Sequence, residues 1–169
     1  MSPRSPRQGF TRLRANALRR GFTLIELLLV IGIIAILASI VIVAINPTKQ
    51  LGDARDAQRR SDVSTILNAV YQYAIDNNGN LPSGIPTGDT SSAKIICQAS
   101  LDPTVCAGNG YFGVSLRMLT GAYLTSIPKD PKVSATGTGT NYMIVQDANG
   151  RITVFAAHPE RATSISVTR

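Results

Sequence analysis

The chain has 169 residues and a formal net charge of +7, and neither its charge nor its apolar content is spread evenly. Six of the seven excess charges are arginines within residues 1–21, which contain no acid, so residues 22–169 hold 11 basic and 10 acidic side chains. A nucleic-acid-binding surface needs its basic residues on the folded body, and this distribution argues against one. Because much of the apolar content lies near the N-terminus, the rest of the chain can support one small domain at most.

Residues 22–47 are expected to form a membrane-spanning helix. The run Leu27–Ile45 carries no charge and is long enough to cross the hydrocarbon core of a bilayer as a helix. The arginine-rich residues 1–21 precede it directly, as a positively charged cytoplasmic flank does. The remaining residues, 48–169, are therefore expected to form a head outside the cytoplasm.

A second, amphipathic helix is predicted over residues 48–77. Asn46-Pro47 separates it from the apolar run, and a proline inside a helical pattern predicts a kink or a local break. The mixed charges from Arg55 to Asp62 are interpreted as a solvated face of this helix, with weak pairs three and four residues apart, and pairing between copies of the chain stays open. Apolar side chains recur at steps of three and four residues and predict the buried face: Val63, Ile66, Leu67, Val70, Tyr73 and Ala74.

The remainder is predicted to be a loop followed by a small sheet. Residues 78–110 are rich in Gly, Pro, Asn and Ser and are expected to form the loop. Within residues 111–169, two β-prone runs, Tyr142–Gln146 and Ile152–Ala156, flank a glycine-containing turn and predict a β-hairpin. The expected fold class is α+β, with a long N-terminal transmembrane helix continuing into a small C-terminal antiparallel β-sheet head.

Cys97 and Cys106 are the two cysteines of the chain. On the oxidising side of a membrane they can form a disulfide that closes a short loop, worth roughly 2–3 kcal/mol by loop entropy. We expect this disulfide, and two free thiols in a reducing compartment are the alternative. Two cysteines alone do not make a metal site, which usually takes four ligands.

No enzyme site can be assembled from the sequence. His158 is the single histidine, and no nucleophile or carboxylate at a catalytic spacing accompanies it. Gly137-Thr138-Gly139 lacks the strand–turn–helix context of a nucleotide-binding loop. Asp130 and Asp147 are too sparse for calcium, which takes six to eight oxygen ligands. We therefore predict no catalytic residue, no cofactor and no metal site.

The residues that join the basic segment to the apolar run carry the main functional signal. A secretory signal peptide is cut after its apolar segment, behind small residues, but here the small residue, Gly21, lies before it. Cleavage after Gly21 would leave the apolar helix at the N-terminus of the mature chain. Glu26 places a carboxylate inside that segment, which costs about 2.5–3.5 kcal/mol at the centre of a span. We expect it to pair with the Phe22 amine of a neighbouring copy, and a carboxylate that merely reaches the membrane surface is the alternative.

The sequence Gly21-Phe22-Thr23-Leu24-Ile25-Glu26-Leu27, followed by the apolar run, resembles the leader junction of type IV pilins and type II secretion pseudopilins. The resemblance implies a type IV pilin-like fold, cleavage between Gly21 and Phe22 by a prepilin peptidase, and N-methylation of Phe22. It also implies a contact between Glu26 and the N-terminus of a neighbouring subunit. It is close over residues 19–45 and looser in three later segments: residues 54–62, 73–82 and 123–131.

The same resemblance implies a structural filament subunit and not an enzyme. Residues 1–21 would be the leader peptide, residues 22–47 the filament core and residues 48–169 the exposed head. The implied partners are other copies of the chain, related minor pilins, the prepilin peptidase and methyltransferase, and an inner-membrane assembly platform with a cytoplasmic ATPase. The chain would cross the bacterial inner membrane once and then enter a periplasmic or extracellular filament.

Two alternatives stay open at this point. Within the resemblance, a secretion pseudopilus is favoured by residues 123–131, which are similar to the G type of pseudopilin, whereas the cysteine pair is more typical of surface or competence pilins. From another class, the chain could be a signal-anchored membrane protein whose head is a binding or catalytic module.

Overall fold

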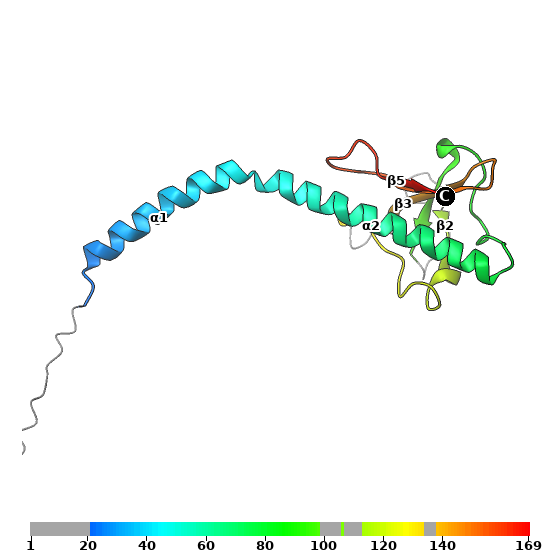
Figure 1. The fold of residues 1–169 in the computed structure, drawn as a ribbon, viewed down its shortest axis with the longest axis horizontal. Helices are drawn as coiled ribbons and strands as arrows, with labels where there is room; N and C mark the ends of the chain where they lie inside the picture. The colour runs from blue at the N-terminus through cyan, green and yellow to red at the C-terminus, as the bar shows by residue number, and fades with distance from the viewer. Residues whose placement is uncertain (1–20, 99–105, 107–112, 134–137) are drawn as a thin grey trace, which may run out of the picture. The chain divides into compact units, whose positions relative to one another are not determined.

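The computed structural model describes residues 21–98, 106, 113–133 and 138–169, and the chain divides into two compact units, residues 1–44 and 45–169. Helix α1 (Leu24–Ile45) fills almost the whole described part of the first unit (Figure 1). None of its residues is buried, and among the described residues it is the one helix long and apolar enough to cross a membrane. The leader predicted over residues 1–21 lies outside the described residues, apart from Gly21.

A single residue, Asn46, separates α1 from helix α2 (Pro47–Asp76). Its φ of 49° lies in the left-handed region, which asparagine tolerates better than most residues, so the helix is interrupted there. The Asn46 side chain accepts a hydrogen bond from the Lys49 N–H at 3.4 Å and caps the new helix. Pro47 stands in the first turn of α2, where its missing N–H removes no hydrogen bond. The break predicted at Asn46-Pro47 is confirmed.

The second unit contains a five-stranded sheet with the strand order β2-β1-β3-β4-β5. Strands β3 and β4 form the predicted hairpin, and β4 and β5 also run antiparallel. The expected α+β class, with a mainly antiparallel sheet in the head, is confirmed. The bounds of the strands are β1 (Lys94–Cys97), β2 (Gly113–Val114), β3 (Gly139–Gln146), β4 (Ile152–Ala156) and β5 (Ser166–Thr168).

Two features of the sheet differ from the prediction. Strand β1 lies inside residues 78–110, which the sequence predicts to be a loop, and it pairs in parallel with β2, so the sheet is not purely antiparallel. Four residues are too short a run to show a clear period, and β1 is defined by its pairing with β3 on one side and β2 on the other. Two short 3-10 helices, η1 (Thr90–Ser92) and η2 (Arg117–Leu119), complete the described elements.

The hydrophobic core lies between α2 and one face of the sheet. The apolar stripe predicted on α2 supplies one side of it, and Val63, Ile66, Leu67 and Val70 are fully buried. Inward-facing residues of the central strands supply the other side, since alternate strand residues share a face: Tyr142, Ile144, Ile152 and Val154. The described part of the head is therefore one α-helix packed on one sheet around a small core.

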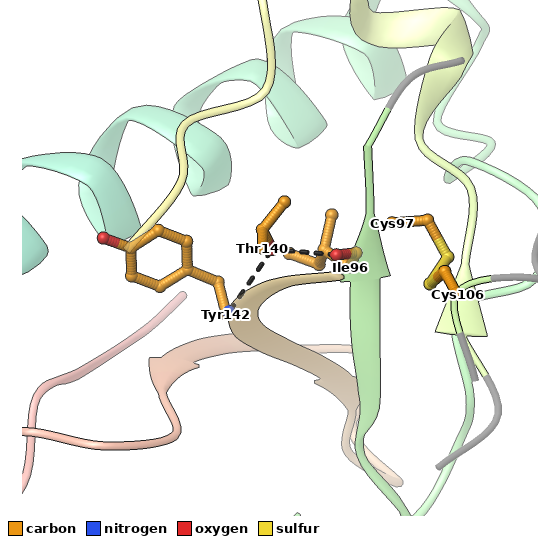
Figure 2. Close-up of a disulfide and its surroundings, with 5 residues drawn as sticks. All are labelled: Ile96, Cys97, Cys106, Thr140 and Tyr142. Atoms are coloured by element: carbon orange, nitrogen blue, oxygen red, sulfur yellow. Dashed lines mark hydrogen bonds between the residues drawn. A yellow bond between two sulfur atoms is a disulfide. The ribbon is translucent and has the colours of Figure 1, made fainter. Parts of the chain in front are cut away.

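Cys97 and Cys106 are joined by a disulfide, with their Cα atoms 5.6 Å apart (Figure 2). The bridge ties the C-terminal end of β1 to Cys106. Close by, where the pairing of β1 with β3 becomes irregular, the buried Thr140 hydroxyl donates to the Ile96 carbonyl at 2.8 Å and accepts the Tyr142 N–H at 3.3 Å. The Thr140 side chain thus supplies hydrogen bonds at a point where the regular ladder is disturbed.

Candidate functional site

The Gly21–Phe22 peptide bond lies just outside α1, which begins at Leu24. Both residues are exposed, and Phe22 keeps 84% of its surface accessible. Exposed backbone outside regular structure is the kind of segment that a peptidase can bind and cut. The cleavage position predicted from the sequence is therefore both accessible and non-helical.

Thr23 and Glu26 form a reciprocal cap on the first turn of α1. Glu26 Oε2 accepts hydrogen bonds from the Thr23 N–H and from Thr23 Oγ1, both at 2.8 Å, and the Glu26 N–H donates to Thr23 Oγ1 at 3.3 Å. This arrangement is a capping box, which the spacing Thr-x-x-Glu could have revealed in the sequence. It turns the carboxylate toward the N-terminal end of the helix, where the macrodipole favours a negative charge.

Gly21, Phe22 and Glu26 consequently lie within one short stretch at the start of α1. Beyond them, α1 presents leucine, isoleucine and valine side chains in every direction, each with about half or more of its surface exposed. An apolar surface of this extent has to be covered by lipid or by other apolar helices. The arrangement can therefore anchor the chain in a membrane or pack it against further helices.

In the head, a buried arginine of α2 joins three carboxylates. The Arg59 guanidinium donates to Asp130 through Nε at 2.5 Å and through Nη2 at 3.0 Å. Its Nη1 donates to Asp56 at 2.8 Å and to Glu160 at 3.0 Å. Arg59 is fully buried, and Asp56 and Asp130 are nearly so. The bonds to Asp130, and then those to Asp56 and Glu160, raise the pKa of Arg59, so the guanidinium stays charged despite its burial.

Asp56 fastens the connection between β4 and β5 to the first half of α2. Its carboxylate accepts the backbone N–H of Glu160 at 3.0 Å and those of Arg161 and Ala162 at 2.7 Å. Burial by itself would raise the pKa of Asp56, but these three N–H groups and Arg59 together hold it well below its ordinary range. The helix therefore carries a fixed negative charge that holds a loop about a hundred residues further along the chain.

Glu160 completes the network at its solvent side. Arg55 donates to its carboxylate through Nε at 2.6 Å and Nη2 at 2.7 Å, and Lys132 Nζ lies 2.9 Å from it. The hydrogen bonds from Arg55, then Lys132 and Arg59, lower the pKa of Glu160 well below its ordinary range. The network thus joins α2 to two separate connections of the head.

The interpretation of Arg55–Asp62 as a solvated helix face is wrong for its buried members, although Arg60 is exposed and the expected local pair between Asp56 and Arg59 is present. Besides Asp56 and Arg59, Asp62 is buried, and its carboxylate accepts the hydroxyl hydrogen of Tyr142 at 2.6 Å. Burial and this bond to Asp62 raise the pKa of Tyr142. The sequence shows the charges only at local spacings, whereas several of their partners lie tens of residues away.

The other residues considered in the sequence for catalysis, calcium binding or nucleotide binding do not form a site within the described residues. The part of the chain that the structure describes holds no group of three or more His, Cys, Asp or Glu side chains that could bind a metal ion. Of the two aspartates considered for calcium, Asp130 is bound by Arg59 and Asp147 pairs with Arg151 at 2.8 Å. His158 is exposed between β4 and β5. Gly137 lies outside the described residues.

A comparison with protein families matches the N-terminal region of the chain. Residues 16–42 match the family described as the prokaryotic N-terminal methylation motif. The matched segment contains Gly21, Phe22, Glu26 and most of α1. The residues that the geometry brings together at the start of α1 therefore lie within the segment that matches the methylation motif.

The chain is also similar, over most of its length, to proteins named type II secretion system core protein G. It is 28% identical to the Escherichia coli K12 protein over 149 residues, which covers 88% of this chain and 87% of the relative. Identity to the Klebsiella pneumoniae protein is 25% over 143 residues, or 84% of this chain and 86% of the relative. Identity to the Vibrio cholerae protein is 31% over 111 residues, which covers 66% of this chain and 64% of the relative. No solved structure gives a significant match. The similarity thus extends well beyond the methylation motif and into the α+β head, so over most of its length the chain resembles the core pseudopilins of type II secretion systems.

Proposed function

We propose that this chain is a structural subunit of a type II secretion pseudopilus, made as a precursor, cleaved after Gly21 and methylated at Phe22. The observation that carries the proposal is a methylation motif joined directly to an apolar helix with no buried residue. The type II secretion system enters the proposal through the names of the similar proteins. Such a subunit does no chemistry of its own: other proteins process it, and it joins a filament through α1.

Cleavage after Gly21 has a physical purpose in this scheme. Residues 1–21 carry six arginines and no acid, which hold the N-terminal end of α1 on the cytoplasmic side of a membrane. Drawing those charges through the bilayer would be very costly, so α1 can leave the membrane only after they are removed. The cut also creates a new amine on Phe22, next to the carboxylate of Glu26.

Glu26 then acts in assembly. A carboxylate inside an apolar filament core needs a partner, and the Phe22 amine of a neighbouring copy supplies one of the opposite charge. Four residues separate the two groups, so a copy displaced by about 6 Å along α1 brings its amine level with this carboxylate. The bonds from Thr23 support the proposal, since they already turn Glu26 toward the helix N-terminus.

The same proposal gives the chain its location and partners. Before assembly it spans the bacterial inner membrane once, with the head outside the cytoplasm, as the arginine flank and the Cys97–Cys106 disulfide support. Its partners are further copies, related minor pseudopilins, the prepilin peptidase and methyltransferase, and an assembly platform driven by a cytoplasmic ATPase.

Intact mass and N-terminal sequencing of the protein extracted from its native membrane test the proposal. We expect a chain that begins at N-methylated Phe22. Gly21→Ile is the matched variant: a Cβ at Gly21 meets no atom of a described residue within 4 Å, so we expect the change to spare the fold and to block cleavage. A wild-type chain that keeps residues 1–21 would instead indicate an anchored protein whose activity lies in its head. A chain that is cut after Ile45 would have lost α1 and would also contradict the proposal.

A further inference from the structure

We propose that neighbouring copies of this chain contact each other through two oppositely charged sites on the head, a cationic hollow at Arg60 and Arg161 and an anionic site at Asp76. The inference rests on the proposed function as a filament subunit and names a second contact surface, distinct from α1. Both sites belong to the second compact unit, residues 45–169.

Charge is separated along α2 and the segment that follows it. Residues 46–60 contain four basic and two acidic side chains, whereas residues 61–93 contain three aspartates and no lysine or arginine. A helix that needs charge only for solubility can mix the two signs along its length. Here the first half of the helix is basic and the second half is acidic.

The basic half opens onto a hollow of about 350 Å³, lined by Asp53, Asp56, Arg60, Arg161 and Ala162. The Asp56 carboxylate already accepts hydrogen bonds from Arg59 and from three backbone N–H groups, which compensate its charge. Asp53 lies 3.8 Å from Arg161, and both side chains are about half exposed. Arg60 is exposed and forms no ion pair within the described residues. Asp53 therefore balances Arg161, while the charge of Arg60 is left without a partner among the described residues, and the hollow favours a further anion.

Asp76 supplies such an anion at the other end of the helix. It is exposed at the C-terminus of α2, accepts the Tyr123 hydroxyl at 2.8 Å, and forms no ion pair with a described lysine or arginine. The last turn of α2 contains no basic residue. A negative charge at a helix C-terminus is disfavoured by the macrodipole, so a cation brought to Asp76 would relieve an unfavourable interaction.

The positions of the two sites on α2 restrict the symmetry by which two copies of the chain can contact each other. Sixteen residues separate Arg60 from Asp76, which amounts to about 24 Å along α2 and about 160° around it. The two side chains thus lie on opposite flanks of the helix, and one flank cannot present both to a partner related by a twofold axis. A copy displaced along α2 can place its Asp76 flank against the Arg60 flank of the first. Such a heterologous contact repeats without closing and extends a filament.

Charge reversal in the full-length chain, expressed with its assembly components, tests this contact. We expect Arg60→Glu and Asp76→Arg each to lower the yield of filaments about fivefold, because each exposed pair becomes a repulsion. The double variant restores the pair with its signs exchanged and should recover most of the wild-type yield. Arg117→Glu, which reverses an exposed cation on η2, is the matched control and should leave the yield unchanged.

A photoreactive residue in place of the exposed Gln72, one turn before Asp76, gives an independent readout. We expect it to crosslink to peptides of another copy that contain Arg60 or Arg161. The inference would be overturned if both single variants and the double variant gave the wild-type yield of filaments, or if the double variant gave a yield as low as the single ones. Either result would leave the proposed function intact. A processed wild-type chain that forms no filament would overturn both.

Discussion

Arg59 holds Asp130 with two hydrogen bonds, of 2.5 and 3.0 Å, although 71 positions separate the two residues in the sequence, and both are buried. Taking two charges out of water is costly, and the geometry repays this only because every part of the pair is hydrogen-bonded. Asp130 Oδ1 also accepts the Lys132 N–H at 2.8 Å. The pair therefore fixes the connection before β3 against α2. Loss of either partner would leave the other as an unpaired buried charge.

Replacing Arg59 by leucine should lower the free energy of unfolding of the head by about 3–5 kcal/mol, because Asp130 and Asp56 would remain buried without their cation. Urea unfolding of the full chain in detergent, followed by circular dichroism, measures the change. Arg60→Leu is the control: Arg60 is the exposed neighbour, and its loss should change the free energy by less than about 1 kcal/mol. Equal effects of the two substitutions would show that the buried network contributes little.

Acid should destabilise the head. The pKa values of Asp56 and Glu160 lie below their ordinary range in the folded chain, so the unfolded chain binds protons more readily. The free energy of unfolding should be fully present at neutral pH, begin to fall near pH 4, where these groups titrate in the unfolded chain, and continue to fall below that. Unfolding measured between pH 7 and pH 3 tests this. Asp56→Asn should be less stable at pH 7 and should show a shallower dependence below pH 4, and an unchanged slope would contradict the assignment.

The parts of the fold that local patterns encode are the parts that the sequence predicts. The stripe from Val63 to Val70 repeats at helical spacing, and the runs around Asp147–Gly150 carry the turn chemistry of a hairpin. Asn46-Pro47 breaks the helix because proline cannot donate and asparagine tolerates a positive φ. In each case, residues close in the sequence determine the structure.

What the sequence does not predict depends on distant partners. Strand β1 is four residues long and is ordered by pairing with β3, which begins more than forty positions later. Two of the three carboxylate partners of Arg59 lie 71 and 101 residues further along the chain, and no local spacing marks them; the third, Asp56, is three residues away. At the N-terminus, by contrast, the spacing Thr23-x-x-Glu26 marks the capping box, although the sequence alone does not show where the carboxylate points.

The disulfide between Cys97 and Cys106 should add about 2–3 kcal/mol to the free energy of unfolding, since it closes a short loop in the unfolded chain. A reductant should therefore lower the urea midpoint of the wild-type chain to that of the Cys97→Ser, Cys106→Ser double variant. The double variant should not respond to the reductant. Thiol alkylation followed by mass measurement establishes the redox state in each sample. A wild-type midpoint that is unaffected by full reduction would show that the bridge does not stabilise the head.

Replacing Glu26 by alanine should leave cleavage after Gly21 intact and abolish most filament assembly. The cut peptide bond lies outside α1, whereas the lost carboxylate is the group that we expect to meet the Phe22 amine of the next copy. Intact mass measures processing, and recovery of filaments by sedimentation and electron microscopy measures assembly. Thr23→Val separates the two roles of this turn, because it removes the hydroxyl from the cap and keeps the carboxylate. That variant should assemble far better than Glu26→Ala. If both variants assemble as the wild type does, Glu26 only caps its own helix and makes no contact between subunits.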